Sequence, residues 1–109
     1  MITDELLQTF KERMHIFHNG EDDNLKRLLS FSVAFVKEKC GDFEINGEND
    51  TDKRATELVI ERARYAYNDA LEYFEDNFLS EIISLSLEMA KNEDGDDDVE
   101  EWIQITTLS

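Results

Sequence analysis

The segment closest to a metal site runs from Asp42 to Gly47, where Asp42, Glu44 and Asn46 alternate with apolar residues before the glycine. A calcium-binding loop begins in this way, because Ca²⁺ prefers oxygen ligands and a glycine in sixth place permits the sharp turn. The twelfth position of such a loop needs a bidentate acid, and Lys53 stands there. We therefore predict no metal site.

The other residues with reactive side chains are His15, His18 and the single cysteine, Cys40. Structural zinc takes four ligands in recognisable paired spacings, which these three residues do not supply. Cys40 falls on an apolar helical stripe, so we expect a small buried side chain and a reducing compartment. The sequence shows no Ser-His-Asp pattern, phosphate-binding glycine loop or dinucleotide fingerprint. We expect a protein that is not an enzyme and uses no cofactor.

The charge is strongly acidic, with a formal net charge of -16 over 109 residues. Most of the excess follows Gly41. Proteins that grip nucleic acid need clusters of Lys and Arg, so we predict no sequence-specific nucleic-acid partner. The second half of the chain must instead face water, cations or a basic partner.

The length and composition predict one helical domain. Forty percent of the residues are hydrophobic and proline is absent, which favours unbroken helices. The first residues lack the features of a signal peptide, and no apolar stretch approaches the roughly 20 residues that span a bilayer. We therefore expect a soluble protein with no membrane partner. We divide the chain into a helical domain over 1–92 and an acidic linker with a C-terminal strand over 93–109.

The apolar periodicity predicts four helices in a mainly α fold, a small antiparallel helical bundle with one long helix. The first helix begins at Thr3 and ends near Met14. The second runs from about Asp23 to Cys40, with an acidic start expected to cap it and Gly41 to end it.

The third and longest helix is predicted from Thr51 or Asp52 to about Asn77. It carries a stripe of small residues, which we expect to pack against the second helix. The stripe consists of Ala55, Val59, Ala63, Ala66, Ala70 and Phe74. The fourth helix is predicted over Leu79 to Ala90. Because apolar side chains surround most of it, it is either central to the core or partly covered by another subunit.

Two segments suggest β structure. The loop over 42–52 allows a short β-hairpin, because Phe43 and Ile45 alternate with polar residues around an Asn-Gly turn. The acidic block Asn92 to Glu101 is followed by a segment from Trp102 to Leu108 that is rich in β-branched residues and predicts a strand. That strand could pair with the hairpin segment or with a neighbouring subunit.

Candidate contact residues lie on the third helix and on the C-terminal strand. Arg62 and Arg64, beside two tyrosines, could contact the acidic flank of a neighbouring copy, although pairing within the helix is the ordinary explanation. Trp102 is costly to leave exposed, so it docks either onto its own core or onto a partner. The candidate interface residues are Arg62, Arg64, Tyr65, Tyr67, Trp102, Ile103 and Ile105.

The second helix and its flanks carry a family resemblance. Glu21-Asp22-Asp23-Asn24-Leu25, then Leu28-Leu29, and finally Lys39-Cys40-Gly41-Asp42-Phe43 resemble the head-tail connector family of tailed bacteriophages, also called head-completion or DNA-packaging adaptor proteins. The short helix before this segment and the long helix after it extend the resemblance over about Thr3 to Asn77.

The resemblance implies a structural virion protein, made in the host bacterial cytoplasm, whose copies form a ring under the portal protein. Such a ring joins the capsid to a tail or head-closure protein and helps to retain packaged DNA. The main alternative, which rests on charge alone, is a small acidic regulator or DNA mimic that binds a basic partner.

Overall fold

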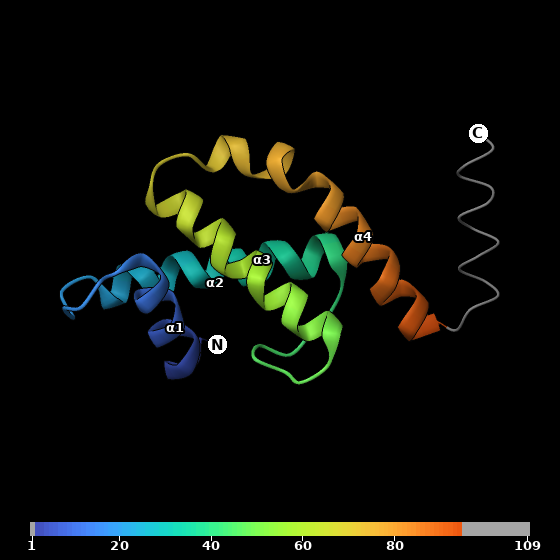
Figure 1. Ribbon diagram of the computed structural model, residues 1–109, viewed down its shortest axis with the longest axis horizontal. Helices are drawn as coiled ribbons and strands as arrows, with labels where there is room; N and C mark the ends of the chain where they lie inside the picture. Colours follow the sequence, from blue (N-terminus) through green and yellow to red (C-terminus); the bar gives the residue numbers. More distant parts are fainter. Residues whose placement is uncertain (1, 95–109) are drawn as a thin grey trace.

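The computed structural model describes residues 2–94, which form helices and loops. The elements, in chain order, are α1 (Asp4–Met14), α2 (Asp22–Cys40), α3 (Asp50–Tyr67), the 3-10 helix η1 (Leu71–Tyr73) and α4 (Phe74–Asp94). Figure 1 shows α2, α3 and α4 running alternately back and forth, with α1 beside the first half of α2. The mainly α class is therefore confirmed.

The predicted β-hairpin is wrong, because residues 2–94 contain no strand. The loop over 42–49 is held by side chains from the first turns of α3. The Asp52 carboxylate accepts a hydrogen bond from the Glu44 backbone N–H at 3.0 Å, and the Thr56 hydroxyl accepts one from Asn46 at 3.2 Å. Backbone groups that a hairpin needs are thus bonded to a helix. The predicted C-terminal strand lies outside the described residues.

Side-chain caps fix two helix starts. The Thr3 hydroxyl accepts the Leu6 N–H at 3.0 Å, and the Asn49 side chain accepts the Asp52 N–H at 2.8 Å. In the described chain Glu21 holds the equivalent place before α2 without making a side-chain cap bond, so the expected acidic cap is wrong. Gly41 ends α2 as predicted, at a φ of 127° that other residues rarely adopt.

The predicted long helix is also wrong, because α3 ends at Tyr67. Asp69 takes a left-handed conformation with a φ of 57°, and the Asn68 side chain donates a hydrogen bond to the Arg64 carbonyl at 3.0 Å. Asn and Asp favour such helix ends because their short polar side chains bond the nearby backbone. The chain reverses there, so Phe74 begins α4 and is no longer part of the stripe on α3.

The core lies where α2, α3 and α4 all pack against one another. Ala55, Val59 and Ala63 are fully buried, which confirms the close packing predicted for the first part of the stripe. Phe78 departs from helical geometry and kinks α4, and beyond this kink three side chains of α4 are buried, namely Ile82, Leu85 and Met89. No helix of residues 2–94 is long and apolar enough to cross a membrane.

Candidate interaction surfaces

The reactive side chains named from the sequence are spread through the fold. Cys40 is buried, and its Sγ lies 3.7 Å from the Ile82 carbonyl oxygen. Burial raises the pKa of this thiol, an effect that nearby Arg54 partly opposes. His15 and His18 are exposed loop residues. Within the described chain, no three His, Cys, Asp or Glu residues gather where they could hold a metal ion.

The arginines and tyrosines predicted as an interface contact several different residues of their own chain. The Arg62 guanidinium lies 4.5 Å from the centre of the Phe35 ring, and its Nη1 donates a hydrogen bond to Ser32 Oγ at 3.2 Å. Burial lowers the pKa of Arg62, with Glu75 opposing the shift. Arg64 donates to Glu61 of the same helix at 2.8 Å. Both arginines therefore have intramolecular partners.

The two tyrosines also face their own chain. The Tyr65 ring makes edge contacts with Phe74 and Phe78, each at 5.7 Å between ring centres. Tyr67 donates a hydrogen bond to Glu21 Oε2 at 2.9 Å, and this bond raises the pKa of the phenol. The four residues on α3 therefore do not form one exposed surface. The other three candidates, Trp102, Ile103 and Ile105, lie outside the described residues.

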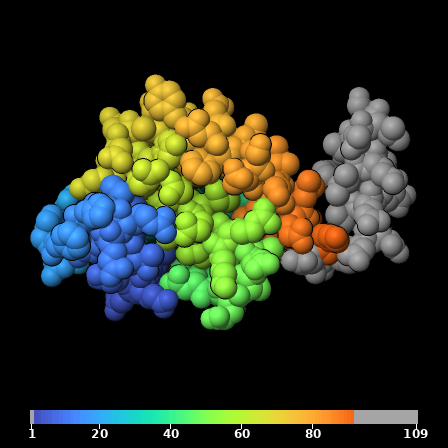
Figure 2. All heavy atoms as spheres, viewed as in Figure 1, coloured from blue at the N-terminus to red at the C-terminus, as the bar shows by residue number. Residues whose placement is uncertain are grey.

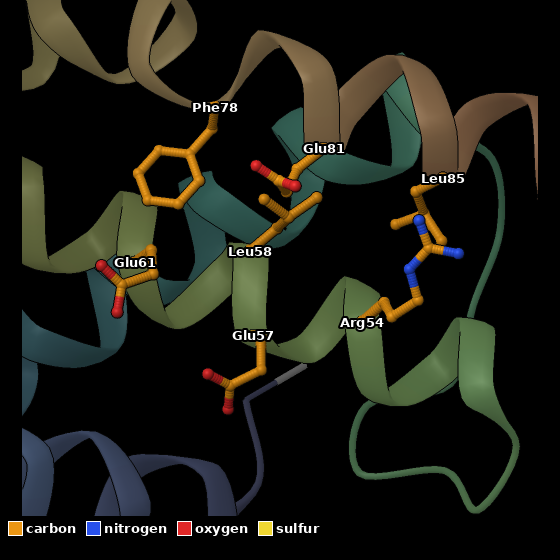
Figure 3. A pocket seen from close by; sticks show the side chains of 7 residues that line it. All are labelled: Arg54, Glu57, Leu58, Glu61, Phe78, Glu81 and Leu85. Atoms are coloured by element: carbon orange, nitrogen blue, oxygen red, sulfur yellow. The ribbon is translucent and has the colours of Figure 1, made fainter.

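A groove between α3 and α4 has a volume of about 370 Å³ (Figure 3). Its lining residues are Arg54, Glu57, Leu58, Glu61, Phe78, Glu81 and Leu85. Arg13 pairs with Glu57 at 3.1 Å and with Glu61 at 3.5 Å, and Arg54 donates to Ser84 at 2.9 Å. Because these charges are largely satisfied within the chain, the groove offers apolar contact and no activated nucleophile.

A second groove lies between α2 and the end of α3, and we call it the Phe31 groove. Its volume is about 320 Å³, and its lining residues are Leu28, Phe31, Ala34, Phe35, Glu38, Arg62, Ala66 and Leu71. Phe31 is 61% exposed and Leu71 is 39% exposed. Two large apolar side chains thus remain in water at its rim, as is typical of a binding surface.

The third surface is the outer face of α4, and we call it the α4 stripe. It consists of Leu79, Ile83, Leu87 and Ala90, which share one side of the helix at spacings of three and four residues. Leu79 and Ile83 are each 50% exposed, whereas Ile82 of the same helix is buried. The fold therefore covers only one side of a helix that is apolar on more than one side. The helix was expected to be either central to the core or partly covered by another subunit, and the structure shows that one side contributes Ile82, Leu85 and Met89 to the core.

The sequence prediction missed Phe31 and Leu71 as surface residues. α2 has two aromatic residues. Phe35 is half-buried, whereas Phe31 is exposed. The available signal was its helical spacing, because Phe31 lies on the opposite side of α2 from buried Leu29 and Val36. Leu71 was hidden because the helix was predicted to continue through it.

Comparison with known proteins adds no relative, since the sequence matches no family model, no curated protein and no solved structure. The described residues form a small acidic helical domain that leaves some apolar surface exposed.

Proposed function

We propose that this protein is a structural virion protein of the head-tail connector type, which assembles with copies of itself into a ring under the portal protein. The ring joins the capsid to a tail or head-closure protein and helps to retain packaged DNA. The protein performs no catalysis in this role. The single observation that carries the proposal is the α4 stripe, an apolar face that its own chain leaves partly exposed at Leu79 and Ile83.

Burying the α4 stripe would favour association. Apolar surface removed from water contributes about 25 cal/mol per Å², and half-exposed Leu79 and Ile83 still have surface to bury. The polar residues beside the stripe include Ser80, Ser84 and Ser86, which carry no charge. Because these serines add no charge, they lessen the repulsion that another copy of a chain with a net charge of -16 meets at this face.

The proposal is tested by measuring molar mass with light scattering and by imaging the protein with purified portal in the electron microscope. We expect oligomers, or rings on the portal, from the wild-type protein. Leu79→Glu should reduce this assembly, because a charge in a buried contact is costly. Gln8→Glu adds the same charge to exposed α1 and serves as the matched control. A wild-type protein that assembles neither alone nor on the portal overturns the proposal.

The acidic charge favours a second candidate, a regulator or DNA mimic that binds a basic protein. Residues 41–94 hold fifteen acidic and five basic residues. Binding through charge should weaken steeply as salt rises, because screening shortens the range of the attraction. Apolar assembly should persist at about 0.5 M salt, where the Debye length has fallen to about 4 Å. A salt-sensitive 1:1 complex with a basic protein, without self-assembly, would support the mimic.

A further inference from the structure

The Phe31 groove and the α4 stripe are two unlike apolar surfaces of one chain. We propose that they bind each other between neighbouring copies, so that α4 of one copy lies in the Phe31 groove of the next. The inference rests on the proposed function, since a closed ring repeats a contact between two different surfaces around its axis. The partner that covers the α4 stripe is then a second copy of the chain, and the contact lies in the Phe31 groove of that copy.

The shapes of the two surfaces agree with this pairing. The groove has a volume of about 320 Å³ between Phe31 of α2 and Leu71 of η1, which are both exposed at its rim. Leu79 and Ile83 lie one turn apart on the same side of α4. Apolar side chains at this spacing are how a helix fills a groove between two other helices.

The charges of the two elements are complementary. α2 carries four basic and three acidic residues, and one of those acids, Asp22, is paired with Lys11 at 2.7 Å. The groove itself is lined by one basic residue, Arg62, and one acidic residue, Glu38, so its own two charges balance. From Phe74 to Lys91, α4 carries four acidic residues and one lysine. The slight basic excess of α2 and the acidic excess of α4 favour the mixed contact.

The same charges disfavour the two symmetric alternatives. A contact of stripe with stripe would bring together two α4 helices that are both acidic, and a contact of groove with groove would bring together two α2 helices that both carry a slight basic excess. Like charges across an interface select against the wrong partner. Each surface is therefore better matched to the other than to itself.

The experiment uses two full-length variants, Phe31→Glu in the groove and Ile83→Glu in the stripe. Both positions are at least half exposed, so the variants should fold, which circular dichroism and thermal unfolding check. Ala34→Glu, at an exposed position of the same groove, repeats the groove test. The wild-type molar mass is measured first, at up to about 1 mM protein, where even a weak contact would be populated.

We expect each variant alone to associate at least about tenfold more weakly than the wild type. An equal mixture of Phe31→Glu and Ile83→Glu should form a heterodimer and nothing larger, because only one intact groove and one intact stripe can meet. Assembly of Phe31→Glu alone would indicate a stripe-to-stripe contact, and assembly of Ile83→Glu alone a groove-to-groove contact. Either result overturns this inference and leaves self-assembly standing.

Two further outcomes separate the inference from the proposed function. If both variants assemble like the wild type, the contact lies elsewhere, and only the pairing of groove with stripe is overturned. If the wild-type protein is monomeric at about 1 mM and also fails to assemble on the portal, the pairing and the proposed function fail together.

Discussion

Among single residues, Lys11 holds the N-terminal helix in place through a buried charge. Its side chain is 6% exposed, and Nζ donates hydrogen bonds to Asp22 at 2.7 Å and to Asn19 at 2.8 Å. A buried charge is tolerated only with such partners. We expect Lys11→Ala to lower the free energy of unfolding by about 2 kcal/mol, as measured by urea denaturation, because it removes these bonds and leaves buried space.

The matched control for this prediction is Lys26→Ala, which removes an exposed lysine from α2 and should change the free energy of unfolding by less than about 0.5 kcal/mol. Lys11→Met retains most of the buried stem and should cost less than Lys11→Ala, since Asp22 remains 28% exposed to water. Equal stability of Lys11→Ala and Lys26→Ala would show that the buried bonds contribute nothing.

Tyr67 makes a pH-dependent contact between the end of α3 and the start of α2. The phenol donates to Glu21 at 2.9 Å, and this bond, with smaller effects of burial and of the Glu21 charge, raises the pKa above its ordinary 10.0. The folded state thus holds the proton more tightly than the unfolded state. The stabilisation is complete below pH 10.0 and is lost as the pH rises through the raised folded pKa.

We expect the difference in phenolate absorbance between wild type and Tyr67→Phe to show a transition above pH 10.0. Glu21→Gln should move this transition to lower pH, because the acceptor loses its negative charge. Glu12→Gln, at an exposed position of α1, is the control and should leave the transition in place. A transition that Glu21→Gln does not move would contradict the assigned hydrogen bond.

At the scale of elements, the loop before α3 depends on one close approach of the backbone. A Cβ added at Gly47 would overlap the Asp52 side chain, whose Cγ and Cβ would lie only 2.6 and 2.8 Å away. Asp52 is itself held by its bond to the Glu44 N–H at 3.0 Å. We expect Gly47→Ala to lower the free energy of unfolding by about 2 kcal/mol, because the carboxylate must give up this bond.

Gly20→Ala is the control for the loop. The nearest atom to a Cβ at Gly20 is His18 Nδ1 at 3.3 Å, the side chain of an exposed residue that can move aside. Its effect on the free energy of unfolding should be within about 0.5 kcal/mol. Thermal unfolding of both variants decides the point, and a Gly47→Ala protein as stable as Gly20→Ala would show that the loop is not packed as described.

The elements that were predictable from sequence are those whose limits are set by nearby residues. The Thr3 hydroxyl caps α1 by accepting the N–H of Leu6, three residues further along, and Gly41 ends α2. Both helix limits are therefore set by nearby residues. The end of α3 also has a local cause, Asn68 and Asp69, but the small-residue spacing continued through it and indicated a longer helix. The loop differs, because its backbone bonds to Thr56, ten residues beyond Asn46.

The candidate surfaces were less predictable, because they depend on contacts between distant residues. Arg62 was expected to pair within its own helix or to contact a neighbouring copy, but its partners Ser32 and Phe35 lie on another helix of the same chain. Helical periodicity did indicate that α4 is apolar on more than one side. It could not show which side the core would cover, since that is decided by the kink at Phe78 and by the packing of α2 and α3.

At the scale of the whole molecule, the described helices form one continuous body (Figure 2), and the chain carries an excess of negative charge. The chain has 27 acidic and 11 basic residues, so there are too few basic residues for most carboxylates to pair with one each. Folding brings these charges closer together than in the extended chain, so self-repulsion opposes the compact state. Salt screens interactions between exposed charges over about 10 Å at 0.1 M.

We therefore expect the melting temperature to rise as sodium chloride increases from about 10 mM to about 200 mM at constant protein concentration. A gain of about 1 kcal/mol corresponds to about 4–8 °C for a domain of this size. Glu48→Lys and Glu72→Lys, at exposed positions outside the core, should raise the melting temperature at low salt and flatten its salt dependence. Potassium chloride should give the same curve as sodium chloride, because screening depends on ionic strength alone. A melting temperature independent of salt would show that self-repulsion is already balanced, and a response to only one cation would assign the stabilisation to a bound ion.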